Sequence, residues 1–457
     1  MAESSHSSAF ERISENVKQF DVTGRTLLFP RMAPFASHLA VASFRAFGVN
    51  AEVMETYKGL ALGKEFTSGK ECFPCQVTLG DVLHHLRKEK ERAGAAFSPD
   101  RYAYFLPDAD GPCRFGMYNK MQRLVLDRFE EFKDIPIVYL TTSDGYATGG
   151  ILPPDRAPLF RRLCYVAVIV ADVMDRIVWR VRPYERRAGM TDEFMAAACG
   201  AMASLIESIG ASRDFPRLYR MLESIAETAR SFIDPRKPRR PLIGIVGEIY
   251  LRSHIDSNQN IVRQIERFGG EVVNASMGEW INFVSYERSR KIRRRLKPAM
   301  LAGDVAASWR LIREWIPSRL EELYQSWRQG QVYRTVLKHL DIRPDHSIGA
   351  IERGLDRDRL YSFDIGTEAG LSIGGAVEYA HHGADGIVNV FPFTCMPSTV
   401  CAAILKPLLH EMKIPYMDAP YDGAIQPNRE TALRTFLHQS RQHFESRHAG
   451  RKNKVWT

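Results

Sequence analysis

The chain has 457 residues, of which 45% are hydrophobic and 26% charged, a composition typical of globular proteins. This length exceeds one ordinary hydrophobic core, so we expect two or three domains. The 63 basic and 54 acidic residues give a net charge of +9, and no nucleic-acid-binding motif accompanies this mild excess. No run reaches the roughly 18 apolar residues of a membrane helix. We therefore expect neither nucleic acid nor a membrane among the partners.

The first residues argue for a cytoplasmic protein. Residues 1–22 are polar and serine-rich, lack an apolar signal core, and are predicted to form a flexible arm. The nearest membrane candidate, residues 163–174, is short and contains Asp172, which indicates a buried segment. In a reducing compartment the seven cysteines are expected to bind metal or do chemistry instead of forming disulfides.

Residues 23–152 are predicted to form a first Rossmann-like α/β domain. Apolar strands alternate with helical patterns and short connections, an order that predicts a parallel sheet. The expected strands cover residues 24–30, 51–54, 102–107 and 135–140, and the expected helices cover residues 37–47, 77–86 and 117–132.

A helical middle domain is predicted at residues 153–238, and a second Rossmann-like domain at residues 239–442. The second domain has expected strands at residues 242–247, 271–275, 386–391 and 414–418, a helix at 260–268, and a helical insertion at about 286–340. Residues 443–457 are predicted to be a flexible basic tail. The fold class is thus α/β, with two parallel-sheet domains and a helical segment between them.

Five cysteines are candidate ligands of an iron–sulfur cluster. Cys72, Cys113 and Cys395 lie in segments bounded by proline or glycine that are predicted to be loops leaving strands, where ligands collect in open α/β sheets. The helical patterns after Cys72 and Cys395 place helix N-termini, which favour negative charge, beside the thiolates. We expect these three cysteines to converge on one cluster, with Cys75 and Cys401 as additional ligands. Three protein thiolates leave one iron open to water or substrate.

Three other interpretations of the thiols stay open. The Cys72 and Cys75 pair has the spacing of a zinc site, although no second such pair completes four ligands. The same pair fits a thioredoxin-like redox motif, which leaves Cys113 and Cys395 unexplained. The third interpretation is that the candidate ligands are ordinary half-buried thiols without a metal. Cys164 and Cys199 lie in apolar stretches and are expected to be inert core thiols.

A few further segments bear on the site. Glu248 and Arg252 follow the first strand of the second domain and are candidate catalytic residues, or a local ion pair. The glycine-rich residues 366–375 lack a P-loop lysine and are predicted to approach the cysteine loops closely. His381 and His382 are interpreted as helix-end residues favoured by the helix dipole. A basic run between Arg176 and Arg187 is expected to be a solvated helix face.

Several motifs resemble the 2-hydroxyacyl-CoA dehydratase component family. The resemblance is carried by residues 243–252, 260–266, 277–280 and 383–397, and extends over most of residues 23–440. The family includes benzoyl-CoA reductase subunits and double-cubane cluster proteins. The dehydratase-like segment of acyl-CoA dehydratase activase-related proteins is the part of the family that the chain resembles most.

The resemblance implies a cofactor, partners and a reaction. It implies a [4Fe–4S] cluster held by Cys72, Cys113 and Cys395 between Rossmann-like halves, with Gly80 as part of the first ligand motif. It also implies an ATP-hydrolysing activator of the actin-like sugar-kinase superfamily, which supplies a low-potential electron. The reaction would be reduction or dehydration of a CoA thioester or other small substrate, by a homodimer or heterodimer, in anaerobic metabolism.

The chain also departs from the family. Cys75 and Cys401 are extra thiols and would suit a larger, double-cubane cluster. The alternatives to an enzyme are a non-catalytic electron-transfer or cluster-scaffold subunit of a reductase, and a zinc-stabilised binding protein.

Overall fold

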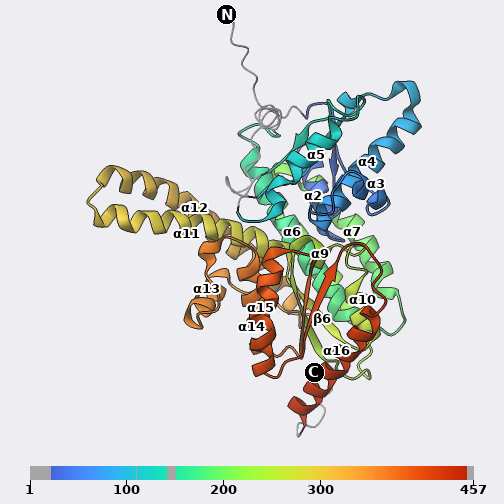
Figure 1. The fold of residues 1–457 in the computed structure, drawn as a ribbon, viewed down its shortest axis with the longest axis vertical. Coiled ribbons are helices and arrows are strands. Elements are labelled where there is room, and N and C mark those ends of the chain that lie inside the picture. The colour runs from blue at the N-terminus through green and yellow to red at the C-terminus, as the bar shows by residue number, and fades with distance from the viewer. Residues whose placement is uncertain (1–21, 110, 141–150, 450–457) are drawn as a thin grey trace, which may run out of the picture.

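The computed structural model describes residues 22–109, 111–140 and 151–449. The protein is mixed α/β, 61% helical, and contains two four-stranded sheets in which all strand pairs are parallel. Both sheets have the same topology, with strand orders β2-β1-β3-β4 and β6-β5-β7-β8. The first unit, in blue, lies above the second, in orange and red, in Figure 1. The α/β class and the two parallel sheets predicted from the sequence are therefore confirmed.

The first sheet is covered on both faces, as its short, nearly all-apolar strands require. Phe44 of α2 and Ile169 of α6 belong to the core on one face, and Leu79 of α4 and Val125 of α5 to the core on the other. The elements of this unit are β1 (Thr26–Phe29), α2 (Ala36–Arg45), β2 (Ala51–Val53), α3 (Leu60–Glu65), α4 (Phe73–Ala93), β3 (Tyr102–Phe105), the 3-10 helix η3 (Arg114–Met117), α5 (Tyr118–Leu126) and β4 (Ile137–Val138).

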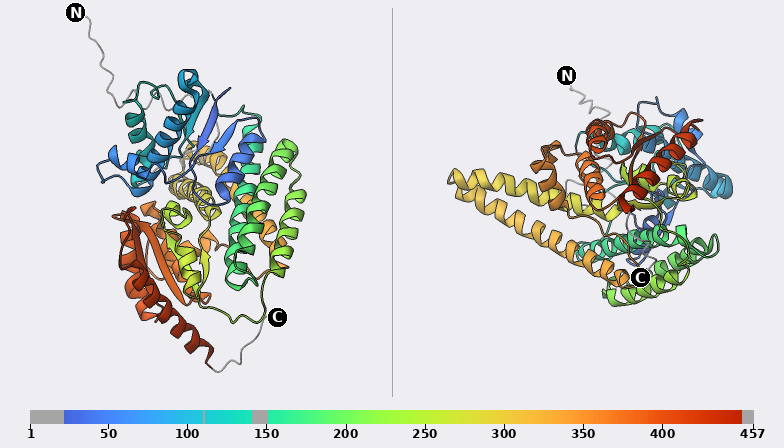
Figure 2. Two further views of the ribbon diagram at one scale, coloured as in Figure 1. Left: turned by 90° about the vertical axis from the view of Figure 1, so that its right-hand side faces the viewer. Right: turned by 90° about the horizontal axis from the view of Figure 1, so that it is seen from below.

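Three helices form the middle segment and flank both sheets, as the green helices of Figure 2 show. They are α6 (Ala157–Val181), α7 (Met190–Ile209) and α8 (Phe215–Ser231). α6 is buried along most of its length, so the apolar run at residues 163–174 is a core helix. The prediction that residues 163–174 are the nearest membrane candidate is corrected, because among the described residues Met190–Ser212 is the helix long and apolar enough to cross a membrane by length and composition, a test that core helices of soluble proteins also pass.

The second sheet carries the remaining elements. Helices α13, α14 and α15 pack on one face and α10 and α16 on the other. The elements are β5 (Leu242–Gly247), α9 (Ile249–Ser253), α10 (Ile261–Arg267), β6 (Glu271–Asn274), α13 (Ile348–Arg357), α14 (Ala369–His381), β7 (Gly386–Pro392), α15 (Met396–Glu411), β8 (Tyr416–Tyr421) and α16 (Arg429–His448).

A helical hairpin projects from the body as a long arm (Figures 1 and 2). It consists of α11 (Met277–Leu301) and α12 (Val305–Leu337), and corresponds to the predicted insertion but begins nine residues earlier. Ser276 fixes this start because its hydroxyl accepts the backbone N–H of Glu279 and caps the helix. Along α12, apolar side chains at helical spacing are exposed, namely Ile316, Leu320, Leu323 and Trp327.

The predicted flexible tail is wrong for residues 443–448, because α16 continues to His448. Two side chains of this last segment interact with the buried Asp385, at the start of β7. His443 Nδ1 lies 3.3 Å and Arg447 Nη1 3.2 Å from its Oδ1. These contacts hold the end of the helix on the sheet. The predicted N-terminal arm lies outside the described residues, apart from residue 22.

The first turns of α4 join the two units. Phe73 and Val77 belong to the hydrophobic core of the second sheet, whereas Leu79 on the same helix belongs to the core of the first. A polar contact lies beside them, where the Thr56 hydroxyl donates to Asp81 (2.6 Å) and lies 2.9 Å from His254 Nε2. α4 therefore packs into both hydrophobic cores and fixes one unit against the other.

Candidate metal centre

Cys72, Cys113 and Cys395 each occupy the residue that precedes a helix. Cys72 is the N-cap of α4, Cys113 of η3 and Cys395 of α15, all with extended backbone. Prolines at the starts of α4 and α15 have no N–H to satisfy and favour helix initiation there. Cys395 follows β7 directly and Cys113 lies in the loop after β3. The prediction for Cys72 is corrected, because its loop follows α3 and not a strand.

One arginine connects the three cysteine loops. Arg114, next to Cys113, donates from Nη1 to the carbonyl oxygen of Lys70 (2.5 Å), two residues before Cys72. Its Nη2 donates to the carbonyl oxygen of Thr394 (2.7 Å), directly before Cys395, and lies 3.3 Å from the Thr394 hydroxyl. Loops that are distant in sequence are thus held side by side.

The thiols are close enough to influence one another. Burial raises the pKa of Cys72 well above its ordinary value, and Glu248 and Cys395 raise it further. Burial raises the pKa of Cys113 to about 12, with added contributions from Glu368, Glu248 and Cys395. Burial, followed by Glu368, also raises the pKa of Cys395 to about 12. The structure therefore brings the three predicted ligands together.

Two carboxyl groups lie at the same place, each on the residue that precedes a helix. Glu248 caps α9 and accepts the backbone N–H groups of Tyr250 (3.0 Å) and Leu251 (2.8 Å). Glu368 is the N-cap residue of α14. Burial raises the pKa of Glu248, and burial together with Glu248 raises the pKa of Glu368 to about 7.

Five helix N-termini thus point at one region. The N-termini of α4, α14 and α15 have no side-chain cap and contribute partial positive charge that favours an anionic group, whereas the first N–H groups of α9 are taken by Glu248. The region lies at the switch point of the second sheet, since Glu248 follows β5, Cys395 follows β7, and these strands are neighbours.

Glycines allow the backbones around this region to approach one another. A Cβ at Gly111, which has φ +121°, would lie 2.8 Å from the carbonyl oxygen of Gly366. The close approach of the glycine-rich segment to a cysteine loop is therefore confirmed. Gly80, in the motif after Cys72, has no room for a Cβ, which would lie 2.2 Å from the carbonyl oxygen of Gly59.

Cys75 and Cys401 are placed differently from the three central thiols. Cys75 is fully buried within α4, and its Sγ lies 3.8 Å from Gln122 Nε2, which donates to it. Cys401 lies in the second turn of α15, and its thiol donates to the carbonyl oxygen of Ala369 (3.6 Å). Each thiol already has a hydrogen-bond partner inside its own unit.

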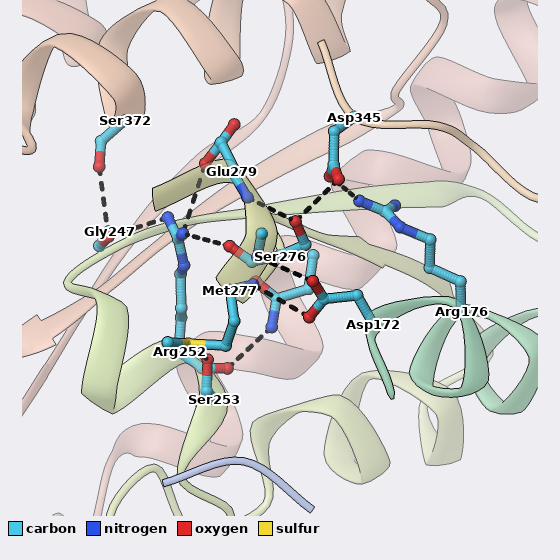
Figure 3. A network of polar contacts seen from close by, with 12 residues as sticks. Asp172, Arg176, Gly247, Arg252, Ser253, Ser276, Met277, Glu279, Asp345 and Ser372 are labelled. Carbon is cyan, nitrogen blue, oxygen red and sulfur yellow. Dashed lines mark hydrogen bonds and ion pairs between the residues drawn. The ribbon is translucent and has the colours of Figure 1, made fainter. Parts of the chain in front are cut away.

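Arg252 of α9, a candidate catalytic residue, lies in a buried polar network (Figure 3). Its Nη2 lies 3.2 Å from the carbonyl oxygen of Ser276 and 3.3 Å from the Glu279 carboxylate. Burial raises the pKa of Glu279 to about 7, an effect that Arg252 opposes. Arg252 therefore forms its ion pair with Glu279, and the Glu248 carboxylate is occupied by backbone N–H groups.

The basic run between Arg176 and Arg187 was predicted to be a solvated face, and this is wrong for its first three arginines. Arg176 is paired with Asp345, Arg180 lies 3.5 Å from Glu271, and Arg182 lies 2.7 Å from Glu266. These arginines connect the middle helices to the second unit through partly or fully buried ion pairs. Arg187 is exposed, as expected.

Glu368 was missed by the sequence analysis. The available signal was an acidic residue directly before a glycine-rich apolar helix, a position that a helix N-terminus favours. Glu368 is far in sequence from Cys72 and Cys113, so the sequence did not indicate that it lies near them.

Neither a scan against models of known protein families nor a search of curated proteins finds a match to this chain.

Proposed function

We propose that Cys72, Cys113 and Cys395 hold an iron–sulfur cluster and that the protein works as a 2-hydroxyacyl-CoA dehydratase-type component. The observation that carries the proposal is the convergence of three cysteines on five helix N-termini, with Arg114 hydrogen-bonded to two of the loops and adjacent to the third. The equal strand orders, with a site at the switch point, support two Rossmann-like units.

The residues present fit such a cluster. Its thiolate-ligated core carries negative charge, which the converging helix N-termini favour. The raised pKa values of Cys72 and Cys75 argue against a thioredoxin-like pair, because an attacking thiol in such a motif has a lowered pKa. Structural zinc sites use four cysteine or histidine ligands, whereas this site offers three thiols and two carboxyl groups. The ligand set therefore argues against structural zinc.

The cluster would supply one-electron chemistry, and the protein would supply ligation, orientation and a proton. Glu368, with a pKa of about 7, is suited to exchange a proton near neutral pH. Glu248 is fixed by two backbone hydrogen bonds and would orient neighbouring groups. The electron would come from an ATP-hydrolysing activator, and the substrate would be a CoA thioester or another small molecule.

The exposed apolar side chains on the arm support assembly of the chain with another subunit, as the resemblance implies for a homodimer or heterodimer. We propose that the protein acts in the cytoplasm.

Anaerobic purification followed by iron, acid-labile sulfide and zinc analysis tests the cofactor. We expect iron and sulfide in the parent, and loss of most of both in Cys72→Ala, Cys113→Ala and Cys395→Ala. Cys199→Ala is the matched control, because this buried thiol lies in the middle helices. Full iron content in Cys395→Ala, or zinc alone in the parent, would overturn the proposal.

The same measurement decides the size of the cluster. With three ligands, Cys75→Ala and Cys401→Ala keep the parent iron content, whereas a double-cubane cluster would lose iron in one or both. Turnover of 2-hydroxyacyl-CoA with an activator ATPase and ATP then separates an enzyme from an electron-transfer or scaffold subunit.

A further inference from the structure

A second group of metal-ligand side chains lies at the other end of α14 from Glu368. Glu378 and His382 are one helical turn apart at the C-terminal end of α14, and His346 comes from the loop between α12 and α13. Each residue offers one ligand atom, and the three atoms lie within 4.8 Å of one another.

The distances fit ligands of a common ion better than hydrogen bonds. Glu378 Oε2 lies 3.6 Å from Nδ1 of His346, beyond hydrogen-bond range. Two ligands on a tetrahedral zinc ion, with bonds of about 2.0–2.2 Å, lie roughly 3.4 Å apart. Small side-chain rotations would close the remaining difference.

The surroundings favour a cation. The C-terminal end of α14 carries a partial negative charge, which adds to that of Glu378. His382 Nδ1 lies 2.8 Å from the carbonyl oxygen of Glu378, so this contact fixes the ring and leaves Nε2 as the nitrogen that would bind the ion. Such a hydrogen bond from the second ring nitrogen is usual for histidines that bind metal through the first.

His346 has a buried ring nitrogen without a partner. Its Nε2 is inaccessible to solvent and makes no hydrogen bond among the described residues. The residue also lines a cavity of about 580 Å³, together with Gln325, whose Oε1 is likewise buried without a partner. The nitrogen that faces Glu378 is Nδ1, which would bind the ion, and Nε2–H would then donate to a water molecule or polar group in the cavity.

We propose that His346, Glu378 and His382 bind a divalent transition-metal ion of the zinc type. Two imidazoles and one carboxylate match such ions, whereas calcium and magnesium prefer oxygen ligands alone. Three protein ligands leave one position for water or a small ligand. The site is independent of the cysteines and of the function proposed for them.

The ion has a structural consequence because His346 follows Asp345. The Asp345 carboxylate accepts from Ser276 (2.8 Å), Gln329 (2.8 Å) and Tyr333 (3.0 Å), and pairs with Arg176. A metal that fixes His346 to α14 would therefore hold the loop on which this buried network depends.

Zinc titration of the chelator-treated full chain tests the site, with four proteins compared. They are the parent, Glu378→Gln, His382→Ala and the control His381→Ala, which removes the exposed neighbouring imidazole. The two ligand variants change partly or largely exposed side chains, so folding is expected to be kept. The cysteines are the same in all four proteins and contribute equally to zinc uptake.

We expect the parent and His381→Ala to bind one zinc ion more per chain than the other two, or to bind it about 10- to 100-fold more tightly. Zinc should raise the unfolding temperature of the first two proteins by a larger amount, since it binds only their folded site. Cobalt at this site should give visible bands without thiolate charge transfer. Equal stoichiometry, affinity and stabilisation in all four proteins would overturn the proposal.

Discussion

The two α/β units share a strand order and deliver cysteines to the same region, but they are held together by different forces. In the first unit, α3 and α4 touch through backbone at Gly59 and Gly80, and α4 packs into both cores. In the second unit, the segment after β5 is fixed by a buried ionic network around Arg252 (Figure 3).

The difference shows how one topology can place ligands by two means. Close packing of two backbones requires complementary surfaces and leaves no space for an added side-chain atom. A buried ionic network requires that every charge keep its partner, because an isolated buried charge is strongly destabilising. The two units should therefore respond differently to substitution, and Arg114 should matter to both.

The largest effect is expected from Arg252→Met in the second unit. The change leaves the Glu279 carboxylate buried without its partner, and should lower the free energy of unfolding by about 3–5 kcal/mol. Chemical denaturation measures this loss. The double variant with Glu279→Met should recover most of the stability, and equal losses in the single and double variants would contradict the ionic account.

Gly80→Ala tests the packing of the first unit. The new Cβ would collide with the Gly59 carbonyl, so α3 and α4 must separate, at a cost of about 1–3 kcal/mol. Gly200→Ala in α7 is the control, because its Cβ would meet no atom within 4 Å and the helix should gain about 0.5–1 kcal/mol. Denaturation curves that shift in the same direction for both variants would disprove the packing argument.

Asp81 should make the stability of the first unit depend on pH. Burial raises its pKa from 3.8 to about 7, so between these values the folded state holds a proton that the unfolded state has lost. Stability should therefore fall as pH rises from about 4 to 7, by at most about 1.4 kcal/mol per pH unit from this group. Asp81→Asn should flatten that part of the stability–pH curve, whereas Asp100→Asn, at an exposed position, should leave it unchanged.

Thr394→Gly should have the smallest effect on stability and a larger effect on the metal centre. Thr394 has φ +64°, a strained conformation for a β-branched residue that glycine adopts freely. Relief of this strain and the greater freedom of the unfolded chain should cancel to within about 1 kcal/mol. Iron retention should fall, because the hydroxyl beside Arg114 is lost and the loop loosens. Unchanged iron content would show that the Thr394 side chain has no role in the site.

The elements were largely predictable, and their ends were not. Alternation of apolar strands and helical patterns gave the parallel class of both sheets. The helix predicted at residues 117–132 is α5, which begins one residue later, after η3, and ends six residues earlier, at Leu126. A short 3-10 turn and a helix have similar apolar spacing, and only packing distinguishes them.

Sequence by itself determined the fold class and the candidate thiols, because strand–helix alternation and loop cysteines are local patterns. Only the tertiary structure decided that Cys72 follows a helix, that α16 continues to His448, and that Arg176, Arg180 and Arg182 are paired internally. It also decided which groups accompany the thiols, namely Glu248 and Glu368. The physical reason is that ion pairs and converging helix N-termini depend on distances in space, which residues far apart in the chain acquire only when the two sheets pack around α4.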